Sequence, residues 1–502
     1  MLSFKYTLVC LLAAYGSVCA QPALLERLSP ESQGLSSSDV RSFFDAMADR
    51  PGGEPHGVMV LRHGKVVGEM VPKPFSPDYG HTLYSASKTF VGVAVGLAVE
   101  ENRLRLTDRV AAFFPELLPD SVSDNLAAMT LRDLLTMTSG IEPDWLMRTS
   151  CADWLSRLLS MPVGHPGERF RYDSMCSYLL SAIVQRVTGR KLLDYLNERL
   201  FFPMGITEAQ WEESPEGVNT GGWGLWLRLE SMAKFGQLLL DKGRWEGRQL
   251  VASDWVEEMT SSLQETDMAD TYGFQTWRCD YPDAFRADGA LGQYIIVAPK
   301  EDMVVAITQA NTGNGKAERK LVWNLLSKAQ PLPLPEGGAY DELRKAQGSY
   351  VLPGVKGKPS AKLLARLVEG EFVFEKNDLD WKTLRLSSSK DTLRMVVATE
   401  SGESYAFPAG RGEWLTSSTD VCPPYSIRAV ERFRGIRRDF HVAACFGGDR
   451  NHLEVKVRYP DWVSGADLSI TLADNILTLK AKENWRKEFK ISGEFRKDIS
   501  PE

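Results

Sequence analysis

The chain has 502 residues and a formal net charge of −7, and 43% of its residues are hydrophobic, 25% charged and 10% aromatic. These values are typical of a soluble globular protein that is long enough for more than one domain. Because the balance is acidic and the basic residues are dispersed, neither a nucleic acid nor an anionic membrane is an expected partner. The sequence contains no phosphate-binding loop, dinucleotide fingerprint, CxxC or HExxH, and its six histidines are scattered, so it predicts neither a cofactor nor a metal site.

The N-terminal residues 1–20 have the pattern of an export signal. Lys5 precedes an apolar run over residues 6–15, and small residues lead to Ala20. The run is too short to anchor the chain across a bilayer, and no other segment approaches transmembrane length. We therefore expect cleavage after Ala20 and a periplasmic mature protein. Lipid attachment at Cys19 is the alternative, which the preceding residues 16–18 match poorly.

The segments that follow mix strand and helix patterns. Residues 57–70 have the pattern of two short strands that turn at His63-Gly64, and residues 294–308 that of a second pair of apolar strands around a polar turn. The periodicity of residues 131–141 and 176–189 predicts two helices, each stopped by a glycine. This mixture of helices with largely antiparallel strands indicates an α+β domain.

A proline-rich segment divides the chain. Residues 328–340 contain three alternating prolines followed by a glycine pair, which neither a helix nor a central strand tolerates. Beyond this segment apolar and polar residues alternate, as expected for a small antiparallel sheet or half-barrel. The predicted division is a signal peptide over residues 1–20, a first domain over 21–328, a linker over 329–338 and a β-rich domain over 339–502.

The cysteines do not indicate a disulfide scaffold. Seven are present and five remain after signal cleavage, which is an odd and sparse number for this length. Cys422 and Cys445, both in the β-rich region, are the pair that the sequence suggests as a disulfide.

Ser85 and Lys88 form an S-x-x-K motif at the head of a nearly all-apolar segment. Residues three apart share a face of a helix, whereas Ser87 points roughly 100° away, so we expect Ser85 to meet the Lys88 amine. Burial lowers the pKa of such an amine from about 10.4 toward neutrality. A neutral amine can take the serine proton, and the N–H groups at the helix start favour a developing oxyanion. The alternative is a lysine that extends to the surface and a serine that only caps the helix.

The same motif occurs twice more, at residues 231–234 and 387–390. Ser387 is expected in a polar turn between strands, where Lys390 is solvated. Ser231 is expected near the start of a helix whose periodicity places Lys234 on the polar face, also in water. Only Lys88 enters a segment that is apolar on nearly all sides, so the motif at residue 85 is the candidate for chemistry.

Residues 81–116, HTLYSASKTFVGVAVGLAVEENRLRLTDRVAAFFPE, resemble the S-x-x-K block of the serine β-lactamase and penicillin-binding protein superfamily. Later blocks of that family resemble, in order, residues 134–141, 166–189, 221–251 and 289–308. The resemblance covers about residues 25–328 and is strongest to class C β-lactamase-like serine hydrolases, which include esterases, D-amino-acid amidases and peptidases, and 6-aminohexanoate-dimer hydrolases. It implies a β-lactamase/transpeptidase-like fold, in which helices and an all-helical lobe flank an antiparallel sheet.

The resemblance implies further site residues. The family's second motif, Y-x-N, falls on Tyr172-Asp173-Ser174, where Tyr172 resembles the phenol that moves a proton between nucleophile, leaving group and water. A nearby ammonium is expected to lower the pKa of this phenol, so that Lys88 and Tyr172 share a proton. Ser174 replaces the usual Asn, and it either binds substrate or caps a helix that starts near Cys176.

The third motif, K-T-G or H-x-G, falls on Ala287-Asp288-Gly289. Ala287 offers no cation for a substrate carboxylate and Asp288 adds a negative charge, which weakens the β-lactamase and carboxypeptidase interpretations. Gly289 lets the backbone approach the acyl group closely. The N–H of Ala290 resembles a second oxyanion donor beside the N–H of Ser85.

Five other residues have two possible roles each. Gln293 fits the G-Q pair of the family, either in packing or in contact with substrate. Trp223, Trp226 and Trp277 either line the cleft or pack in the core. His81 is near the nucleophile in sequence but is expected to be structural, because a Lys/Tyr mechanism does not need it.

Together these residues predict an exported serine hydrolase that cleaves an ester or amide of a small or peptide-like substrate through an acyl-enzyme. A β-lactamase or a peptidoglycan DD-peptidase is the alternative among enzymes. A binding protein that has kept the fold and lost turnover is the alternative from another class.

Overall fold

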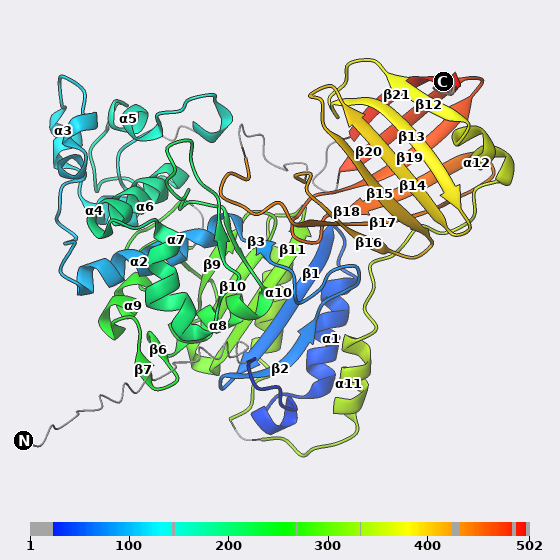
Figure 1. Cartoon of the computed structure of the whole chain (residues 1–502). Helices are drawn as coiled ribbons and strands as arrows, with labels where there is room; N and C mark the ends of the chain where they lie inside the picture. Colours follow the sequence, from blue (N-terminus) through cyan, green and yellow to red (C-terminus); the bar gives the residue numbers. More distant parts are fainter. Residues whose placement is uncertain are drawn as a thin grey trace, which may run out of the picture.

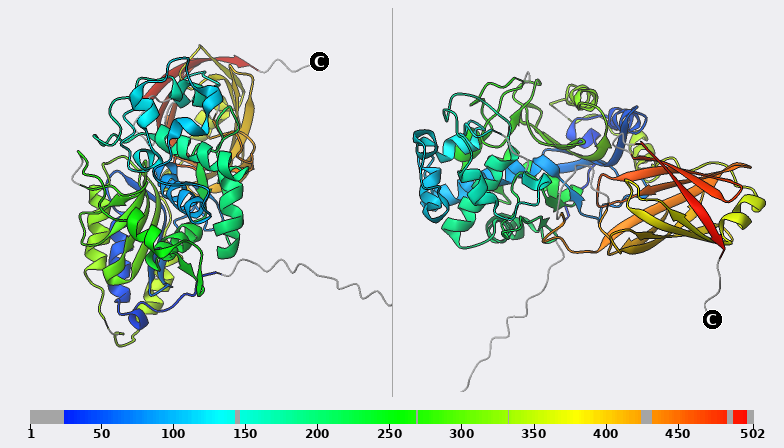
Figure 2. Two further views of the ribbon diagram at one scale, coloured as in Figure 1. Left: turned by 90° about the vertical axis from the view of Figure 1, so that its left-hand side faces the viewer. Right: turned by 90° about the horizontal axis from the view of Figure 1, so that it is seen from above.

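The computed structural model describes residues 24–142, 146–267, 270–331, 333–423, 432–483 and 488–497. The predicted signal peptide, with Cys19, lies outside these residues. The described chain forms an N-terminal domain (residues 24–352) and a C-terminal barrel (residues 361–497), which lie beside each other (Figures 1 and 2). Within the described residues, no helix is long and apolar enough to cross a membrane.

The N-terminal domain is built on a six-stranded antiparallel sheet with the order β2-β1-β11-β10-β9-β8. Its strands are β1 (Gly53–Arg62), β2 (Lys65–Met70), β8 (Trp277–Arg278), β9 (Phe285–Gly289), β10 (Gln293–Ala298) and β11 (Met303–Asn311). The two strand pairs expected over residues 57–70 and 294–308 are therefore confirmed as β1–β2 and β10–β11.

Helices cover both faces of this sheet. α8 (Leu229–Leu240) packs on one face, while α1 (Ser37–Ala48) and α10 (Lys316–Leu326) pack on the other. Alternate residues of β1 serve the two cores, because Met59 belongs to the cluster with α8 and Val58 to the cluster with α1. The central strands β10 and β11 are thus buried on both faces, and their sequences are largely apolar throughout.

A mostly helical lobe lies next to the sheet (Figure 1). Its helices are α2 (Ser87–Glu100), α3 (Asp124–Ala128), α4 (Leu131–Leu135), α5 (Trp154–Leu159), α6 (Ser174–Thr188), α7 (Leu192–Leu196) and α9 (Ser253–Met259). α6 ends at Gly189 in the left-handed conformation, as its glycine stop predicts. The helix expected over residues 131–141 is shorter, because Met137 has a positive φ of 59° and the chain leaves the helix before Gly140.

Five short strands complete this domain. They are β3 (His81–Thr82), β4 (Gln210–Trp211), β5 (Leu225–Leu227), β6 (Arg244–Trp245) and β7 (Arg248–Gln249). β3 pairs with β5, which fixes the segment that leads into α2.

The C-terminal region is the antiparallel β domain expected from the sequence, and its strands form a closed barrel where a small sheet or half-barrel was expected. The strands β15-β14-β13-β12-β21-β20-β19-β18-β17 pair antiparallel in this order, and a parallel pairing of β15 with residues 445–446 of β17 closes the ring. β16 pairs antiparallel with the preceding residues 440–444 of β17. Its elements are α12 (Ala361–Leu367), β12 (Gly370–Phe374), β13 (Trp381–Ser389), β14 (Thr392–Thr399), β15 (Ser404–Arg411), β16 (Leu415–Thr419), β17 (Phe440–Gly448), β18 (His452–Arg458), β19 (Gly465–Ala473), β20 (Ile476–Glu483) and β21 (Glu488–Lys497). Cys422 and Cys445 are both free thiols, so the suggested disulfide is absent.

The segment after the proline-rich linker packs on the N-terminal domain. α11 (Ala339–Gln347) lies against α1, with Leu343 fully buried between them. Further along, the N–H of Lys73 donates to the Tyr350 carbonyl at 3.0 Å and the N–H of Leu352 to the Lys73 carbonyl at 2.8 Å. The barrel itself starts with α12, so the packing divides the chain near residue 355.

Candidate active site

Ser85 lies in a short 3-10 helix, Tyr84–Ala86, between β3 and α2. Its side chain is half-buried, whereas every residue of α2 from Ser87 to Ala98 is buried. Ser87 points away from the site, since its hydroxyl donates to the Tyr84 carbonyl at 2.6 Å and accepts from the N–H of Leu225 at 3.1 Å. The structure therefore leaves the hydroxyl of Ser85, not that of Ser87, accessible beside Lys88.

Lys88 is 1% exposed and its amine meets three oxygen atoms. Nζ lies 3.1 Å from Ser85 Oγ, 3.0 Å from Ser174 Oγ and 2.5 Å from the carbonyl oxygen of Gly222. Burial lowers the pKa of Lys88 from 10.5 to about 7, while the carboxylate of Asp173 acts in the opposite direction. A substantial fraction of the amine is consequently neutral at neutral pH.

The partners of a neutral Lys88 amine fix the direction of its lone pair. The Gly222 carbonyl can only accept, so it takes one of the two N–H bonds. The Ser174 hydroxyl can accept the other, which leaves the lone pair for the O–H of Ser85. This arrangement has the geometry that a general base needs toward a nucleophile.

Tyr172 lies beside the same two groups. A hydrogen bond joins its hydroxyl to that of Ser85, and Lys88 Nζ is 4.9 Å from the centre of its ring. The expected lowering of its pKa is wrong, because burial raises the pKa of this phenol above its usual value of 10.0. The expectation rested on a fully charged neighbour, whereas burial lowers the pKa of Lys88 to about 7 and thereby weakens its effect on the phenol. Tyr172 is thus held as a neutral phenol, able to donate a proton.

Ser174 is the first residue of α6, and Asp173 caps this helix by accepting from the N–H of Met175 at 2.9 Å. The capping role considered for Ser174 therefore belongs to Asp173. Ser174 instead contacts Lys88, as described above. Asp173 is buried at 5% exposure, which is the reason that its charge reaches the amine.

The third motif lies on β9, next to the turn that holds the nucleophile. A Cβ atom on Gly289 would lie 2.2 Å from the Leu83 carbonyl oxygen and 3.3 Å from the Ala86 nitrogen. Glycine is therefore required for the close packing of β9 on the turn that holds Ser85. Ala287 is buried in the core of the domain.

The charge of Asp288 is compensated by its neighbours. Arg286 Nε donates to Asp288 at 2.7 Å and Arg286 Nη2 to Asp270 at 2.8 Å. The negative charge expected at this edge is therefore paired. The guanidinium of Arg286 is paired as well, because its Nε and Nη2 each donate to a carboxylate.

Ala290 and Gln293 lie in and after the turn between β9 and β10. Ala290 is half-buried and packs against the core of the C-terminal barrel. Gln293 is fully buried, and its Nε2 donates to the carbonyl groups of Ala290 at 3.1 Å and Gln309 at 2.7 Å. The structure thus gives Gln293 a packing role, in which it holds the turn that carries Ala290.

The tryptophans divide between the two cores. Trp277 lies beside Tyr172, with ring centres 5.3 Å apart. Trp223 is buried below the cation of Arg432, whose guanidinium lies 5.5 Å from its ring centre, and Trp226 stacks on Trp462 of the barrel at 5.2 Å. Of the three, Trp277 is the one placed next to the candidate catalytic residues.

The two further S-x-x-K sequences differ from expectation at two residues. Ser387 was expected in a turn between strands but lies within β13. Lys390 is exposed in the turn after β13, as expected. Lys234 is not solvated: it is 4% exposed and its Nζ donates to the Met204 carbonyl at 3.2 Å. α8 is covered on its polar side as well as on its sheet side, so the amphipathic pattern of the helix did not report the burial of this lysine.

Sequence reasoning missed two groups at the site. The Gly222 carbonyl orients Lys88, and a Cβ atom at this position would lie 2.6 Å from the Ser174 carbonyl oxygen. The Gly221-Gly222 pair was the available signal, since adjacent glycines mark a close backbone approach. Asp173 was visible as part of the second motif, but its burial was not. Among the described residues, no group of three or more His, Cys, Asp or Glu side chains is placed to hold a metal ion.

Comparisons with known proteins agree with this geometry. A family model described as Beta-lactamase matches residues 40–330. The 6-aminohexanoate-dimer hydrolase of Paenarthrobacter ureafaciens is 26% identical over 278 residues, which cover 49% of this chain and 70% of that protein. Protein flp of Staphylococcus aureus (strain NCTC 8325 / PS 47) is 29% identical over 147 residues, or 28% of this chain and 29% of that protein.

Solved structures extend the comparison to the fold. The structure named "Putative 6-aminohexanoate-dimer hydrolase from Bacillus anthracis" matches with a TM-score of 0.53 at 22% identity, over 63% of this chain and 90% of that one. This likeness confirms the α+β, β-lactamase/transpeptidase-like fold expected from the sequence. Because the family model spans more than half of its residues, the chain belongs to the beta-lactamase family.

Proposed function

We propose that this chain is an exported serine hydrolase that cleaves an ester or amide bond through an acyl-enzyme on Ser85. The observation that carries the proposal is the buried Lys88 amine 3.1 Å from the hydroxyl of the half-buried Ser85. Membership of the beta-lactamase family supports hydrolase chemistry. The pattern of residues 1–20 supports export.

In the proposed mechanism Lys88 is the general base. Its lone pair takes the proton of Ser85 as the oxygen attacks the substrate carbonyl, and Ser174 and Gly222 hold the amine in place. The new oxyanion is received by backbone N–H groups of Ser85 and Ala290, because β9 packs directly on the turn that holds the nucleophile.

Tyr172 completes the proton path. Its raised pKa makes the neutral phenol the resting form, so it is suited to protonate the leaving group as that group departs. The Lys88 ammonium returns its proton to the phenolate, which restores the neutral amine and the neutral phenol. A water molecule then attacks the acyl-enzyme while Lys88 takes its proton, and that proton passes to the departing oxygen of Ser85 as the acid product leaves. In this assignment the base and the acid are separate groups, rather than a pair that shares one proton.

The substrate class follows from the third motif. Ala287 supplies no cation, and the nearby guanidinium of Arg286 is already paired with Asp288 and Asp270. β9, all of whose residues are described, therefore offers no unpaired cation for the carboxylate of a β-lactam or of a peptide C-terminus. Similarity to a 6-aminohexanoate-dimer hydrolase supports a linear amide or ester as substrate.

The test compares Ser85→Ala with a matched serine in a second S-x-x-K sequence, Ser387→Ala, which lies exposed on β13. We expect Ser85→Ala to lose on the order of 10³-fold or more of kcat on p-nitrophenyl butyrate, with an unchanged circular dichroism spectrum, and Ser387→Ala to retain full activity. A fluorophosphonate probe should add its mass to Ser85. Undiminished turnover by folded Ser85→Ala would reject the proposal, and efficient nitrocefin hydrolysis by the wild type would replace the substrate class.

A further inference from the structure

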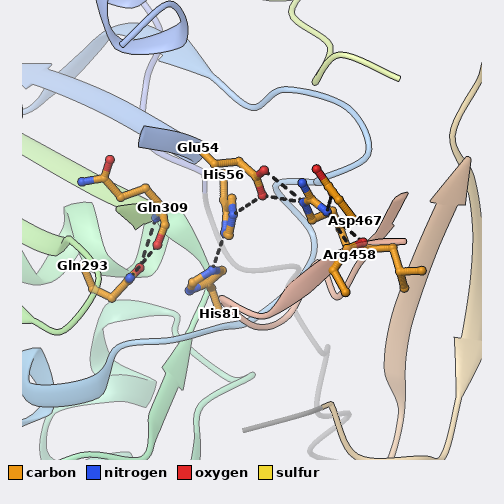
Figure 3. A network of polar contacts seen from close by, with 9 residues as sticks. Glu54, His56, His81, Gln293, Gln309, Arg458 and Asp467 are labelled. Carbon is orange, nitrogen blue, oxygen red and sulfur yellow. Dashed lines mark hydrogen bonds and ion pairs between the residues drawn. The ribbon is translucent and has the colours of Figure 1, made fainter. Parts of the chain in front are cut away.

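A series of polar side chains joins the C-terminal barrel to the strand that precedes the nucleophile (Figure 3). It begins with Arg458 on β18, whose Nε donates to the two carboxylate oxygens of Glu54 on β1 at 2.8 and 3.0 Å. Arg458 Nη1 also donates to Asp467 on β19 at 2.9 Å. Arg458 is only 6% exposed, so this contact between the two domains is a buried ion pair.

From Glu54 the connection continues through two buried histidines. His56 lies two residues after Glu54 on β1, and the backbone of β1 joins the two, because burial lowers the pKa of His56 and its Nε2, 3.4 Å from Glu54 Oε1, has no hydrogen-bond partner among the described residues. His56 Nδ1 lies 2.9 Å from His81 Nε2. His81 Nδ1 in turn lies 2.8 Å from the carbonyl oxygen of Thr82. We call Arg458, Glu54, His56 and His81 the interdomain polar chain.

The carbonyl at the end of the polar chain determines its proton order. Because a carbonyl oxygen only accepts, His81 carries its proton on Nδ1 and its Nε2 accepts from the N–H of His56. Burial lowers the pKa of His81 to about 3, so this ring remains neutral. The last two hydrogen bonds therefore have one fixed direction, from His56 through His81 to Thr82.

An irregularity in β1 makes the polar chain possible. The register of β1 with β11 shifts between Pro55 and Gly57, which leaves His56 outside the regular pairing. Such a shift redirects a side chain. The His56 ring stacks on Phe75 with ring centres 3.8 Å apart, and this contact fixes it in the direction of His81.

The polar chain ends where the barrel also touches the backbone directly. The N–H of Thr82 donates to the carbonyl of Asp461, in the connection between β18 and β19, at 3.2 Å. Both polar backbone groups of Thr82 are therefore held, one by the barrel and one by His81. Two residues later Tyr84 adopts a positive φ of 46° and packs on Trp462, with ring centres 5.3 Å apart. Ser85 follows at once.

We propose that the interdomain polar chain is a positioning device through which the C-terminal barrel holds Ser85 in its reactive geometry. None of its members touches the site of reaction, so each acts through the backbone of residues 82–84. The inference deepens the proposed function and depends on it only for its kinetic readout. It gives the barrel a role in turnover, as the part of the protein that keeps a strained backbone in place.

The first test uses three variants and a matched control. His81→Leu removes the hydrogen bond to Thr82, Arg458→Met removes the ion pair between the domains, and His81→Asn keeps a donor at the position of Nδ1. The control, Arg385→Met, removes a barrel arginine that pairs with Glu371 within the barrel at 3.1 Å. Each variant is first compared with the wild type by thermal unfolding.

We expect His81→Leu and Arg458→Met to lower kcat and the rate of fluorophosphonate labelling by roughly 10- to 100-fold, with KM changed less than about twofold, because misplacement of a reacting group by about 1 Å has effects of this size. His81→Asn should recover most of the loss and Arg385→Met should show none. A folded His81→Leu or Arg458→Met with wild-type kcat overturns the proposal, as does a loss that His81→Asn shares in full.

Two readouts do not depend on turnover. Amide hydrogen exchange of residues 82–87 should quicken in His81→Leu and Arg458→Met and stay unchanged in Arg385→Met. In wild-type protein labelled with ¹⁵N-histidine, NMR should find His81 as the Nδ1–H tautomer from pH 5 to 9. An Nε2–H tautomer, or titration of His81 near pH 6.5, overturns the polar chain even if no variant folds. Absence of Ser85 labelling in the wild type, by contrast, would reject the proposed function while these two measurements still judge the polar chain.

Discussion

Replacing Lys88 by methionine should stabilise the protein while removing its activity. The depression of the Lys88 pKa from 10.5 to about 7 corresponds to roughly 5 kcal/mol of folding free energy spent on burying the amine at or below pH 7. Methionine has a similar length and avoids this penalty. The change also leaves the Ser174 hydroxyl and the Gly222 carbonyl without their N–H donors, which costs about 1–3 kcal/mol for each of the two groups. We therefore expect a net gain of up to about 3 kcal/mol at pH 7.

The pH dependence of this gain identifies its cause. Between pH 7 and 10.5 the unfolded chain binds a proton on Lys88 and the folded chain does not, so the stability of the wild type rises with pH across this window. The advantage of Lys88→Met is then complete at pH 7 and below, and it shrinks toward pH 10. Urea unfolding of both proteins at pH 6.5, 8 and 9.5 measures the difference, in which all other titrating groups cancel.

Two control variants distinguish the effect of burying a lysine from the effect of its place in an S-x-x-K sequence. Lys390→Met, at the exposed lysine of the third S-x-x-K sequence, should leave stability and activity unchanged. Lys234→Met removes a buried lysine whose pKa is also lowered by burial, and it should keep ester hydrolysis. If Lys88→Met is less stable than the wild type by more than about 1 kcal/mol at pH 7, or if the difference does not change with pH, the amine is not the buried base described above.

The remaining predictions concern the surroundings of the same amine. The carboxylate of Asp173 raises the pKa of Lys88. Asp173→Asn, which retains a helix cap, should therefore move the acidic limb of the kcat/KM profile from near pH 7 to lower pH. An acidic limb that stays in place or moves to higher pH contradicts this prediction. Gly289→Ala places a Cβ 2.2 Å from the Leu83 carbonyl, so it should lower the free energy of unfolding by at least about 2 kcal/mol and abolish labelling of Ser85. The control is Gly338→Ala, where φ is −66° and a Cβ meets no atom within 4 Å, and it should change neither.

Local patterns in the sequence were sufficient to predict the contact between Ser85 and Lys88 at the centre of the candidate site. Ser85 and Lys88 are three residues apart, so helical geometry alone brought them together, and the apolar run after Lys88 reported its burial. Lys234 shows the limit of this reasoning. Its helix is amphipathic, yet the segment around Met204 covers the polar face. Nothing in the sequence of the helix indicates that this face is buried.

The barrel shows the same limit at the level of the fold. Strands that alternate apolar and polar residues, such as β14 and β18, were expected, but β17 is buried along nearly its whole length and has no such alternation. Its burial arises from β15, which pairs with it in parallel and closes the ring. Closure of a barrel depends on pairs of strands that are distant in sequence, and a pattern within one strand does not reveal it.

The direction of the Tyr172 pKa was missed for a related reason. A phenol next to an ammonium was expected to ionise more easily, but that argument treated the charge of Lys88 as fixed. In the structure one apolar environment acts on both groups, and it favours the neutral amine and the neutral phenol together. In the proposed mechanism the first step needs a neutral base and a protonated acid at the same pH. Desolvation supplies the neutral amine, and it keeps the phenol in the protonated form that it already has at neutral pH.

This preparation has a structural cost that is concentrated in a few residues. Within residues 84–88 the chain holds a positive φ at Tyr84 and a buried lysine, and Gly289 packs on it too closely for any side chain. Each feature opposes folding, and a short helical turn does not offset them by itself. The contacts that do so come from outside the turn, through the Trp462 ring on Tyr84 and the Asp461 carbonyl on Thr82, both supplied by the barrel. A domain that adds no group to the reaction can in this way be needed for it, because it stabilises the one backbone conformation in which the serine, the amine and the phenol meet.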